Sequence, residues 1–431
     1  MSHFFRFLSA VILLKLFDYF LVIGIDKWRD GVFETESDGL ANHIAISLVI
    51  ASASFVVFVF RYFIYKYIFK DDTKQGLTGN FEYYTGPVKS VYSGYASSDA
   101  TRSNAASGGI VSACMIELLN TGQVDGCLLY RLEKNDGKLV VSPFIASNEE
   151  EVLSCQGSIY IQFPALSPEV MVMLREFDGK LAVVGLPCAI SAFRKKCEKE
   201  DSGLSDKISY MVGLFCGHTS QKKMLDIVLR QKNISECDIS EFYFRKGSWR
   251  GKTVIQLKDS SEISFPSWHY NLYQNLYVHS HPGCLNCTDH FAENADISVG
   301  DIWIKEFKSK EIKHSAFTAR TDKGVELLGS LIKDNKIVAN PADTRFLFRA
   351  NKRAVIFHKA ARAKRIAGKF WGIKIRKNPH AKPAGLNEIL AALIFLGMYR
   401  WSESKYGRAI FRLPYILLWI ILIIAKLLTN F

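Results

Sequence analysis

The sequence has no cysteine before Cys114, and its nine cysteines form an odd set at irregular spacings. Small secreted proteins that depend on disulfides carry even sets of cysteines at regular spacings. The pattern therefore excludes a secreted disulfide framework and favours a reducing, cytosolic setting for the folded body. At 431 residues, the chain is long enough for two globular domains, or for one large domain with appendages.

Acidic residues are missing between residues 351 and 383, a segment that holds eleven Lys or Arg residues. Much of the formal net charge of +13 therefore lies in one place. Basic residues beside an apolar element are attracted to anionic lipid headgroups by roughly 1 kcal/mol each. We predict membrane lipid as the partner of this segment, in preference to nucleic acid or to a plain solvated face.

Long apolar runs are missing from the middle of the chain and are confined to its ends. Residues 44–60 carry no charge, and residues 7–25 carry only Lys15 and Asp18, which share a helix face. With their flanks, both runs approach the roughly 20 residues that a spanning helix needs. We predict a transmembrane hairpin over residues 1–72. The Lys and Arg bias places the catalytic body on the cytoplasmic side of the inner membrane.

The apolar run near the carboxy terminus, residues 413–425, is only thirteen residues long. An interfacial helix or a shallow re-entrant segment is therefore at least as well supported as a third crossing. Residues 386–399 predict either a core helix or part of the same membrane contact. We interpret residues 351–431 as a basic segment followed by a membrane-associated tail.

The middle of the chain alternates short β-rich runs with helical patterns, which is typical of an α/β protein with mixed sheets covered by helices. Residues 182–185 and 211–215 have the continuous apolar character of strands buried on both faces. Cys188 and Cys216 follow these two runs. We therefore expect both thiols at the carboxyl ends of strands, where open α/β sheets build their ligand sites.

Cys284 and Cys287 form a Cys-x-x-Cys pair, which can hold one side of a metal ion or cluster from a single tight turn. A lone pair supplies half a site, and Cys188 and Cys216 are well placed to supply the rest. Four thiolates suit zinc and a 4Fe–4S cluster equally in ligand number, and unbound buried thiols are a third interpretation. Zinc sites usually use two close pairs, whereas here one pair would join two isolated cysteines.

A second candidate site lies upstream, where Ser107, Gly108 and Gly109 precede a predicted helix over residues 110–120. Glycines at a helix start let backbone N–H groups approach an anion, and the helix dipole favours a phosphate there. An ordinary helix cap is the alternative interpretation. Farther along, Arg245 lies in a predicted strand that is followed by a basic turn. The alternative interpretation of this segment is a hairpin with a solvated turn.

Several motifs occur in the order seen in the coenzyme F-420 (deazaflavin) hydrogenase/dehydrogenase beta-subunit family, which the chain resembles over residues 81–349. The motifs are Arg102 with residues 106–109, residues 157–160, residues 185–190, residues 215–218, the Cys284 and Cys287 pair, and residues 295–301. Members of this family are flavin and 4Fe–4S oxidoreductases. The resemblance implies an electron-transfer enzyme whose flavoprotein body has two parts, residues 79–175 and residues 176–350.

The resemblance also implies roles for individual residues. One 4Fe–4S cluster would be held by Cys188, Cys216, Cys284 and Cys287. An FAD would be contacted by residues from both parts of the body, namely Arg102, Ser107, Gly108, Gly109, Ser158, Tyr160 and Arg245.

The sequence departs from the family pattern at three places. Relatives usually carry a ferredoxin-like cysteine cluster ahead of the flavoprotein part, and this chain has no cysteine there. Ile159 replaces a lysine, and Leu186 and Ala189 replace two polar residues. These changes argue against use of the deazaflavin coenzyme and leave FAD and one cluster as the expected cofactors.

We therefore expect a membrane-anchored flavin and iron–sulfur oxidoreductase that exchanges electrons with a separate donor protein or reduced carrier. Relatives without the ferredoxin part resemble proteins of surface-polysaccharide pathways, which suggests a small-molecule or glycan-linked substrate, such as a lipid-linked intermediate. The alternative is a non-catalytic membrane scaffold with a structural zinc site. The residues at Ile159 and Leu186 favour that alternative, and retention of all four cysteines opposes it.

Overall fold

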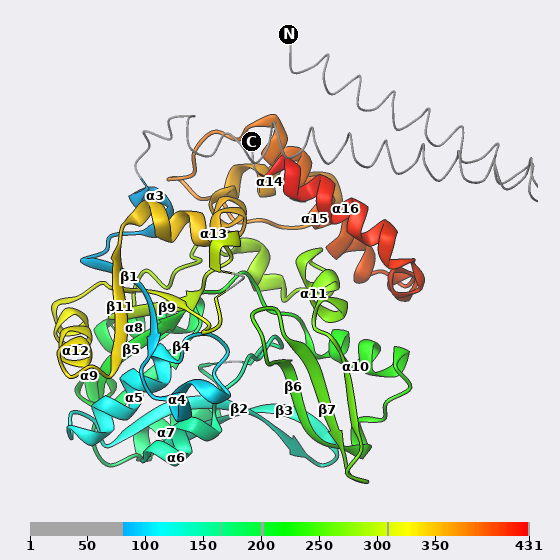
Figure 1. Cartoon of the computed structure of the whole chain (residues 1–431). Coiled ribbons are helices and arrows are strands. Elements are labelled where there is room, and N and C mark those ends of the chain that lie inside the picture. Colours follow the sequence, from blue (N-terminus) through cyan, green and yellow to red (C-terminus); the bar gives the residue numbers. More distant parts are fainter. Residues whose placement is uncertain (1–80, 164, 200–201, 308–309, 430–431) are drawn as a thin grey trace, which may run out of the picture. The chain divides into compact units, whose positions relative to one another are not determined.

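The computed structural model describes residues 81–163, 165–199, 202–307 and 310–429, which belong to one compact unit. Its main feature is an eight-stranded sheet with the strand order β11-β1-β10-β9-β5-β4-β2-β3 (Figure 1). The strands are β1 (Ser90–Ala96), β2 (Gly126–Asn135), β3 (Lys138–Ala146), β4 (Leu181–Gly185), β5 (Ile208–Leu214), β9 (Ile297–Asp301), β10 (Ser315–Ala319) and β11 (Ile337–Ala342).

The sheet is mixed in direction. Strands β2, β4, β5 and β9 run parallel to one another at its centre, whereas β3, β10, β1 and β11 pair antiparallel at its two sides. All five residues of β4 are buried, as expected for a strand covered on both faces. The prediction of a mixed sheet covered by helices is confirmed.

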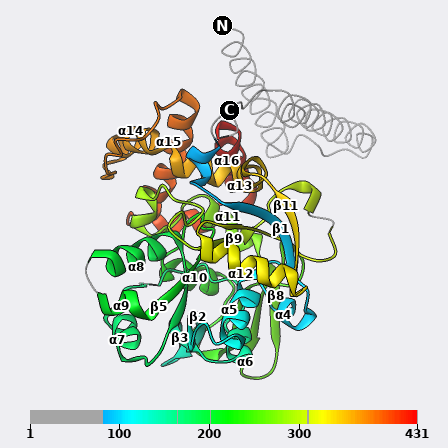
Figure 2. The ribbon, with the colours of Figure 1, turned by 90° about the vertical axis from the view of Figure 1, so that its left-hand side faces the viewer.

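Helices cover both faces of this sheet (Figure 2), and β4 shows how its sequence serves both. Leu181 and Val183 pack in one core with α7 (Pro168–Glu176), α8 (Pro187–Lys199) and α9 (Ser202–Lys207). Ala182 and Val184 point the other way and pack with α5 (Ile110–Asn120), α6 (Glu149–Ser154) and α12 (Asp322–Lys333). Burial of each large aliphatic side chain contributes about 1.5–3 kcal/mol.

A second, three-stranded antiparallel sheet is formed by β6 (Ile239–Lys246), β7 (Lys252–Leu257) and β8 (Glu262–Pro266). The predicted hairpin that contains Arg245 is therefore present. The apolar side chains of this sheet share one core with α10 (Lys222–Gln231), α11 (Trp268–Asn275) and the carboxy-terminal helices. Those helices are α13 (Thr344–Lys359), α14 (Ala361–Trp371), α15 (Leu386–Ser402) and α16 (Tyr415–Leu428).

The shorter elements connect these layers. They are the helices α3 (Glu82–Thr85) and α4 (Asp99–Ser103), and the single 3₁₀ turns η3 (Glu236–Asp238), η4 (Pro282–Asn286), η5 (Lys305–Phe307) and η6 (Gly407–Arg412).

The membrane predictions need correction. In the described ranges, no helix combines the length and the apolar character that crossing a bilayer requires, which contradicts both a third crossing and the predicted inner-membrane location. The predicted hairpin over residues 1–72 lies outside the described residues. Helix α15 is a core helix, one of the two interpretations of its sequence, because Ala391, Ala392 and Leu396 are fully buried. A helix packed on a protein core has the same apolar composition as a short membrane segment, so the sequence alone left both interpretations open.

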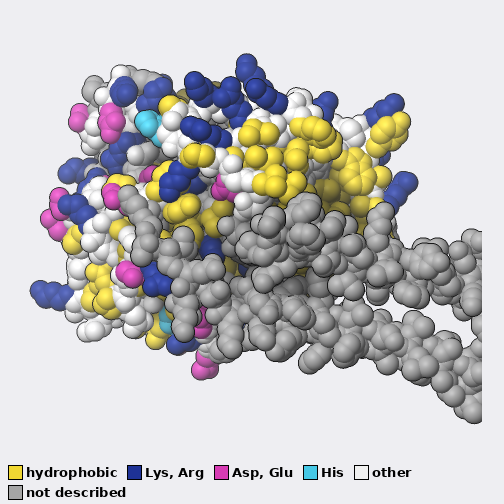
Figure 3. All heavy atoms as spheres, turned by 90° about the horizontal axis from the view of Figure 1, so that it is seen from above, with side chains coloured by type: hydrophobic (Ala, Val, Ile, Leu, Met, Phe, Trp, Pro, Cys, Tyr) yellow, Lys and Arg dark blue, Asp and Glu magenta, His cyan; other side chains and the backbone are white. Residues whose placement is uncertain are grey.

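Helix α16 is apolar on two sides but packs on only one. Leu418, Leu422 and Ala425 are buried in the core, whereas Ile416 and Ile420 are exposed. Figure 3 shows hydrophobic side chains on this face of the molecule beside many Lys and Arg side chains. The lipid partner of the basic segment stays a prediction.

Asp296 is the most heavily bonded buried carboxylate near the centre of the sheet, with no exposed surface. It accepts hydrogen bonds from the Met211 amide at 2.8 Å and from the Thr321 hydroxyl at 2.9 Å. It also pairs with Arg194 and Lys323, each at 3.3 Å. One side chain therefore connects β5, α8 and the start of α12.

We expect Asp296→Ala to lower the free energy of unfolding by about 3 kcal/mol, because it leaves buried donors without an acceptor. Asp322→Ala is the control. Asp322 pairs with Lys89 at 2.6 Å but is 84% exposed, so its loss should cost at most about 1 kcal/mol. Urea unfolding measures both, and equal effects would show that the buried network does not hold the sheet.

Candidate cofactor site around four cysteines

Cys188 and Cys216 follow the carboxyl ends of two neighbouring parallel strands, as the sequence predicts. Strand β4 ends at Gly185, and Cys188 is the second residue of α8. Strand β5 ends at Leu214, and the Cys216 amide donates a hydrogen bond to the His290 carbonyl at 2.9 Å. The parallel pairing of β4 with β5 therefore brings the two cysteines to the same edge of the sheet.

Cys284 and Cys287 lie on the 3₁₀ turn η4 and directly after it, where the Cys287 amide donates to the Cys284 carbonyl at 3.1 Å. The segment is attached to the loop after β5, because the His281 amide donates to the Thr219 carbonyl at 2.9 Å. The Thr219 hydroxyl oxygen also lies 3.6 Å from the Cys284 sulfur. The Cys-x-x-Cys turn is thereby held beside the loop that contains Cys216.

The four thiols are close enough to influence one another electrostatically. Burial raises the pKa of the Cys216 thiol well above its usual value, and Cys284, Cys287 and Cys188 raise it further. Cys188 reaches the surface, but partial burial of its thiol still raises its pKa. The nearby Cys284 is the second cause of this increase. Burial raises the pKa of Cys287 to about 11. The structure therefore brings together all four cysteines that the sequence indicated.

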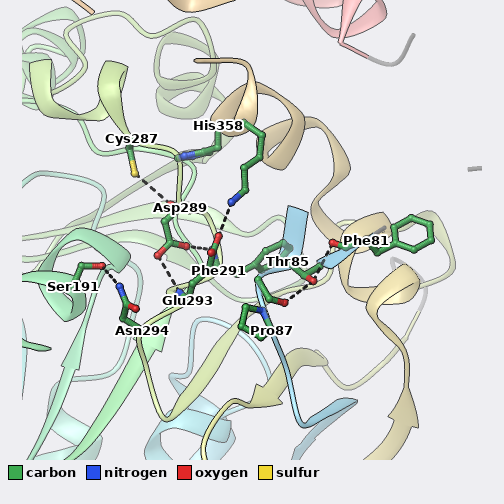
Figure 4. Close-up of polar contacts among 12 residues, drawn as sticks. Phe81, Thr85, Pro87, Ser191, Cys287, Asp289, Phe291, Glu293, Asn294 and His358 are labelled. Carbon is green, nitrogen blue, oxygen red and sulfur yellow. Dashed lines mark hydrogen bonds and ion pairs between the residues drawn. The ribbon is translucent and has the colours of Figure 1, made fainter. Parts of the chain in front are cut away.

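Polar groups close to Cys287 orient its turn. The Cys287 thiol donates to the Asp289 carbonyl at 3.3 Å, and Figure 4 shows this sulfur directed toward Asp289. The Asp289 carboxylate in turn accepts from the amides of Phe291 at 2.9 Å and Glu293 at 3.0 Å. Burial, and then the nearby Glu293, raise the pKa of Asp289. Asp289 thus orients the loop that follows the cysteine pair, because its carboxylate accepts hydrogen bonds from the backbone of that loop.

Residues of the basic segment also reach this site, which the sequence did not indicate. The His358 Nε2 atom lies 2.5 Å from the Gly217 carbonyl. The Lys364 ammonium donates to the Cys287 carbonyl at 2.8 Å, and burial lowers the pKa of this lysine to about 8. A signal was present: Lys364 lies among the small residues Ala363 and Ala367, on the helix face that becomes buried.

The candidate phosphate-binding loop, residues 105–109 (the phosphate loop), is held in place by hydrogen bonds to other parts of the protein. The Ser107 hydroxyl donates to the His314 carbonyl at 2.8 Å, and the Gly108 amide donates to the Ser315 hydroxyl at 2.9 Å. A Cβ atom on Gly108 would lie 2.7 Å from the Gly94 carbonyl oxygen, so the loop packs directly on the sheet. Gly109 precedes α5 with φ +79° and provides no side-chain cap. The first turn of α5 therefore keeps backbone N–H groups that can face an anion.

The guanidinium of Arg102 already bonds to neighbouring groups of the protein. Its guanidinium donates to the carbonyls of Ala96 at 2.5 Å and Ser97 at 2.8 Å, and it pairs with Asp99. These contacts fix the end of β1. The structure gives Arg102 a local role, and it places the side chain beside Gly109, where an added Cβ atom would lie 3.5 Å from the Arg102 Cγ atom.

Arg245 is buried and lies next to the phosphate loop. It forms two hydrogen bonds to the Asp301 carboxylate, at 2.9 and 3.1 Å, and it also donates to the Ala106 carbonyl. Burial alone would lower the pKa of Arg245, but Asp301 and then Tyr160 raise it overall. Lys313, which the sequence did not indicate, donates to the Ala105 carbonyl at 2.6 Å. Two cations from distant segments therefore hold the start of the loop.

Tyr160 lies in the same neighbourhood, and Ser158 lies two residues before it, half-buried in the loop after α6. The Tyr160 ring packs against Phe244 at 5.3 Å and against Tyr270 at 6.2 Å. The Trp303 ring centroid lies 5.5 Å from the Arg245 guanidinium carbon, and Trp303 is 42% exposed. Arg245, Tyr160 and Trp303 thus connect the phosphate loop with the second sheet.

Comparison with known proteins agrees with this architecture. Residues 91–168 match the amino-terminal model, and residues 178–345 the carboxy-terminal model, of the coenzyme F420 hydrogenase/dehydrogenase beta subunit. Together these segments make up more than half of the chain, and all four cysteines of the site lie in the second one. Lys364 and His358 lie beyond both.

Individual relatives match at low identity. The coenzyme F420 hydrogenase subunit beta of Methanococcus voltae is 27% identical over 259 residues, which cover 58% of this chain and 82% of that protein. An uncharacterized protein of Methanocaldococcus jannaschii is 26% identical over 205 residues, which cover 46% of this chain. This chain spans about half the length of that protein, 53%.

A solved structure shares the fold. A chain of the F420-reducing NiFe hydrogenase complex from Methanosarcina barkeri superposes with a TM-score of 0.52 at 22% identity. The superposition covers 69% of this chain and 98% of that one. The two family models, which match more than half of the chain, show that the chain belongs to the coenzyme F420 hydrogenase/dehydrogenase beta-subunit family, a family of oxidoreductase subunits.

Proposed function

We propose that the chain passes electrons between an FAD and a 4Fe–4S cluster held by Cys188, Cys216, Cys284 and Cys287. The observation that carries this proposal is the convergence of these four thiols from two adjacent strand ends and one Cys-x-x-Cys turn. Membership in an oxidoreductase family supports it.

The donor set suits a cluster better than a single metal ion. Four cysteine thiolates are the usual ligands of a 4Fe–4S cluster. A tetrahedral zinc ion would need its sulfur ligands only about 3.8 Å apart, given its usual bond length to sulfur. Within the part of the chain that the structure describes, no three His, Cys, Asp or Glu side chains are grouped so that they could hold a metal ion. One Cys-x-x-Cys pair joined by two isolated cysteines also differs from the two close pairs of most structural zinc sites.

The chain's own residues would enclose and orient these cofactors. When bound, the cluster would exchange one electron at a time, and the flavin would link such steps to two-electron chemistry. Leu285, between the paired cysteines, and Phe291 are almost fully buried, so water is excluded from this side of the site. Burial raises the pKa of the Tyr277 hydroxyl well above its usual value, and Cys284 is the next cause. This tyrosine, a neighbour of the cysteines, therefore stays protonated.

For the flavin, we propose that the first turn of α5 with Gly108 and Gly109 faces a phosphate. Arg245 and Tyr160 would lie nearby, and the exposed Trp303 indole offers a flat surface for ring stacking. Ser107, Arg102 and Ser158 are the remaining candidates, and Ser107 and Arg102, like Arg245, already bond to the protein. Ile159 packs against an apolar core, which is consistent with FAD in place of the deazaflavin coenzyme.

A protein partner is proposed as the other participant in electron exchange. The Methanococcus voltae relative is named as a hydrogenase subunit, and the solved structure is a hydrogenase complex. A small-molecule substrate at the flavin follows from the family's class of reactions. The relatives described above do not point to a glycan-linked substrate or a polysaccharide pathway, so that prediction has the least support.

A non-catalytic scaffold with a structural metal is the second candidate. The specific observation in its favour is that Arg102 and Ser107, two expected flavin contacts, form hydrogen bonds within the protein. It differs from the main proposal in predicting no flavin and no redox-active cluster.

The four cysteines should behave as a unit. Replacing any one of them with Ala removes an iron ligand, so iron content and the broad absorbance near ~400 nm should fall together in anaerobically purified protein. Cys237→Ala is the matched control, because Cys237 is exposed and belongs to a distant 3₁₀ turn. Full iron in the Cys188 and Cys216 variants, with loss only in the Cys284 and Cys287 variants, would refute a shared site.

The flavin site should depend on Arg245 and not on the cysteines. We expect Arg245→Gln to lower flavin content at least tenfold, and Cys284→Ala to leave it unchanged. Lys246→Gln is the control, since Lys246 is the next residue of β6 and is exposed. Flavin fluorescence after denaturation measures the content. Equal flavin in the Arg245 and Lys246 variants would contradict the assignment of Arg245.

A further inference from the structure

Lys364 is a fully buried cation that has no carboxylate partner among the residues that the structure describes. Only 2% of its surface is exposed, and it ranks among the largest fully buried side chains of the described core. Its ammonium donates to the carbonyls of Cys287 at 2.8 Å and His358 at 3.2 Å. It forms no ion pair with any residue in the ranges that the structure describes.

A buried charge of this kind is unfavourable unless a negative group compensates it. Two basic residues nearby have such compensation: Lys359 pairs with Glu293 at 2.6 Å, and buried Arg320 lies where the charges of Asp289 and Glu293 favour its own. The two carbonyl groups that Lys364 bonds to are neutral dipoles, so they do not cancel its positive charge. The Lys364 ammonium lies beside Cys287 and Cys284, and these two cysteines favour its charged form when they are ionised. The position of the lysine therefore points to a negative group at the four cysteines.

Lys364 comes from a part of the chain beyond the family models. It lies on α14, whereas the carboxy-terminal model ends at residue 345. Its approach to the cysteines depends on neighbouring contacts: His358 reaches the Gly217 carbonyl at 2.5 Å, and the Arg376 amide donates to the Asn286 side chain at 2.7 Å. The carboxy-terminal segment thus closes over the Cys-x-x-Cys turn and brings one charge with it.

We propose that Lys364 is the counter-ion of the four-cysteine centre and raises its reduction potential. This inference rests on the proposed 4Fe–4S cluster. Four thiolates give such a cluster a net negative charge, and reduction adds one more electron. A fixed positive charge nearby stabilises the reduced form more than the oxidised form. Lys364 is a positioning residue, because it acts on the cluster through charge and through the Cys287 backbone.

The test is the midpoint potential of the cluster in the full-length, anaerobically purified protein, followed by spectroelectrochemistry. Lys364→Gln removes the charge but keeps a donor for the two carbonyls. We expect the ratio of reduced to oxidised cluster at a fixed ambient potential to fall at least tenfold, a negative shift of about 59 mV or more for one electron. Lys364→Arg, which keeps the charge, should stay close to the wild-type value.

Lys369→Met is the matched control, because Lys369 is exposed on the same helix and its loss changes the net charge equally. Its potential should not change. The proposal is overturned if Lys364→Gln retains wild-type iron and wild-type potential, or if the Lys369 variant shifts as much. If the glutamine variant loses its cluster, retention of iron in the arginine variant supports a charge requirement, and loss in both variants while the protein remains folded refutes it.

These outcomes separate the inference from the proposed function. Wild-type protein without iron would refute the cluster itself and leave no potential to measure. Wild-type protein with a cluster whose potential ignores Lys364 would refute only the role of the lysine.

Discussion

The parallel pairing of β4 with β5 is the constraint on which the site depends. It brings the carboxyl ends of the two strands together, and with them Cys188 and Cys216. The surrounding loops can pack closely against this edge because two positions, Gly213 and Gly300, carry no side chain. A Cβ atom on Gly213 would lie 2.2 Å from that of Ala292, and one on Gly300 would lie 2.3 Å from the Phe215 ring. Glycine at these two positions thus makes room for the loop that contains Ala292 and for the Phe215 ring, while the His281–Thr219 hydrogen bond holds the cysteine pair beside the strand ends.

The second contribution comes from the carboxy-terminal segment. Helices α13 and α14 lie beyond the residues that the family models match, yet His358 and Lys364 bond to the loops that carry Cys216 and Cys287. The same family core is therefore enclosed here by an element of this chain. That enclosure removes water from one side of the cysteines and adds a positive charge, both of which bear on electron transfer.

Much of the fold and half of the site could be predicted, because the signals are local. Apolar runs ending in Cys188 and Cys216 predict buried strands, and Gly109 before residues 110–120 predicts a helix start. Other features depend on distant partners. Lys364 bonds to a carbonyl 77 residues away, and Ser107 to one 207 residues away, so neither contact follows from spacing. For helix α16, an apolar run does not reveal which side protein will cover, and the structure buries only the side that holds Leu418, Leu422 and Ala425.

The central claim is that the four cysteines hold one 4Fe–4S cluster. The most direct measurement is the content of iron, acid-labile sulfide and zinc per chain in anaerobically purified full-length protein. The account predicts about four iron and four sulfide ions per chain with little zinc. One zinc per chain, with neither iron nor sulfide, would contradict it.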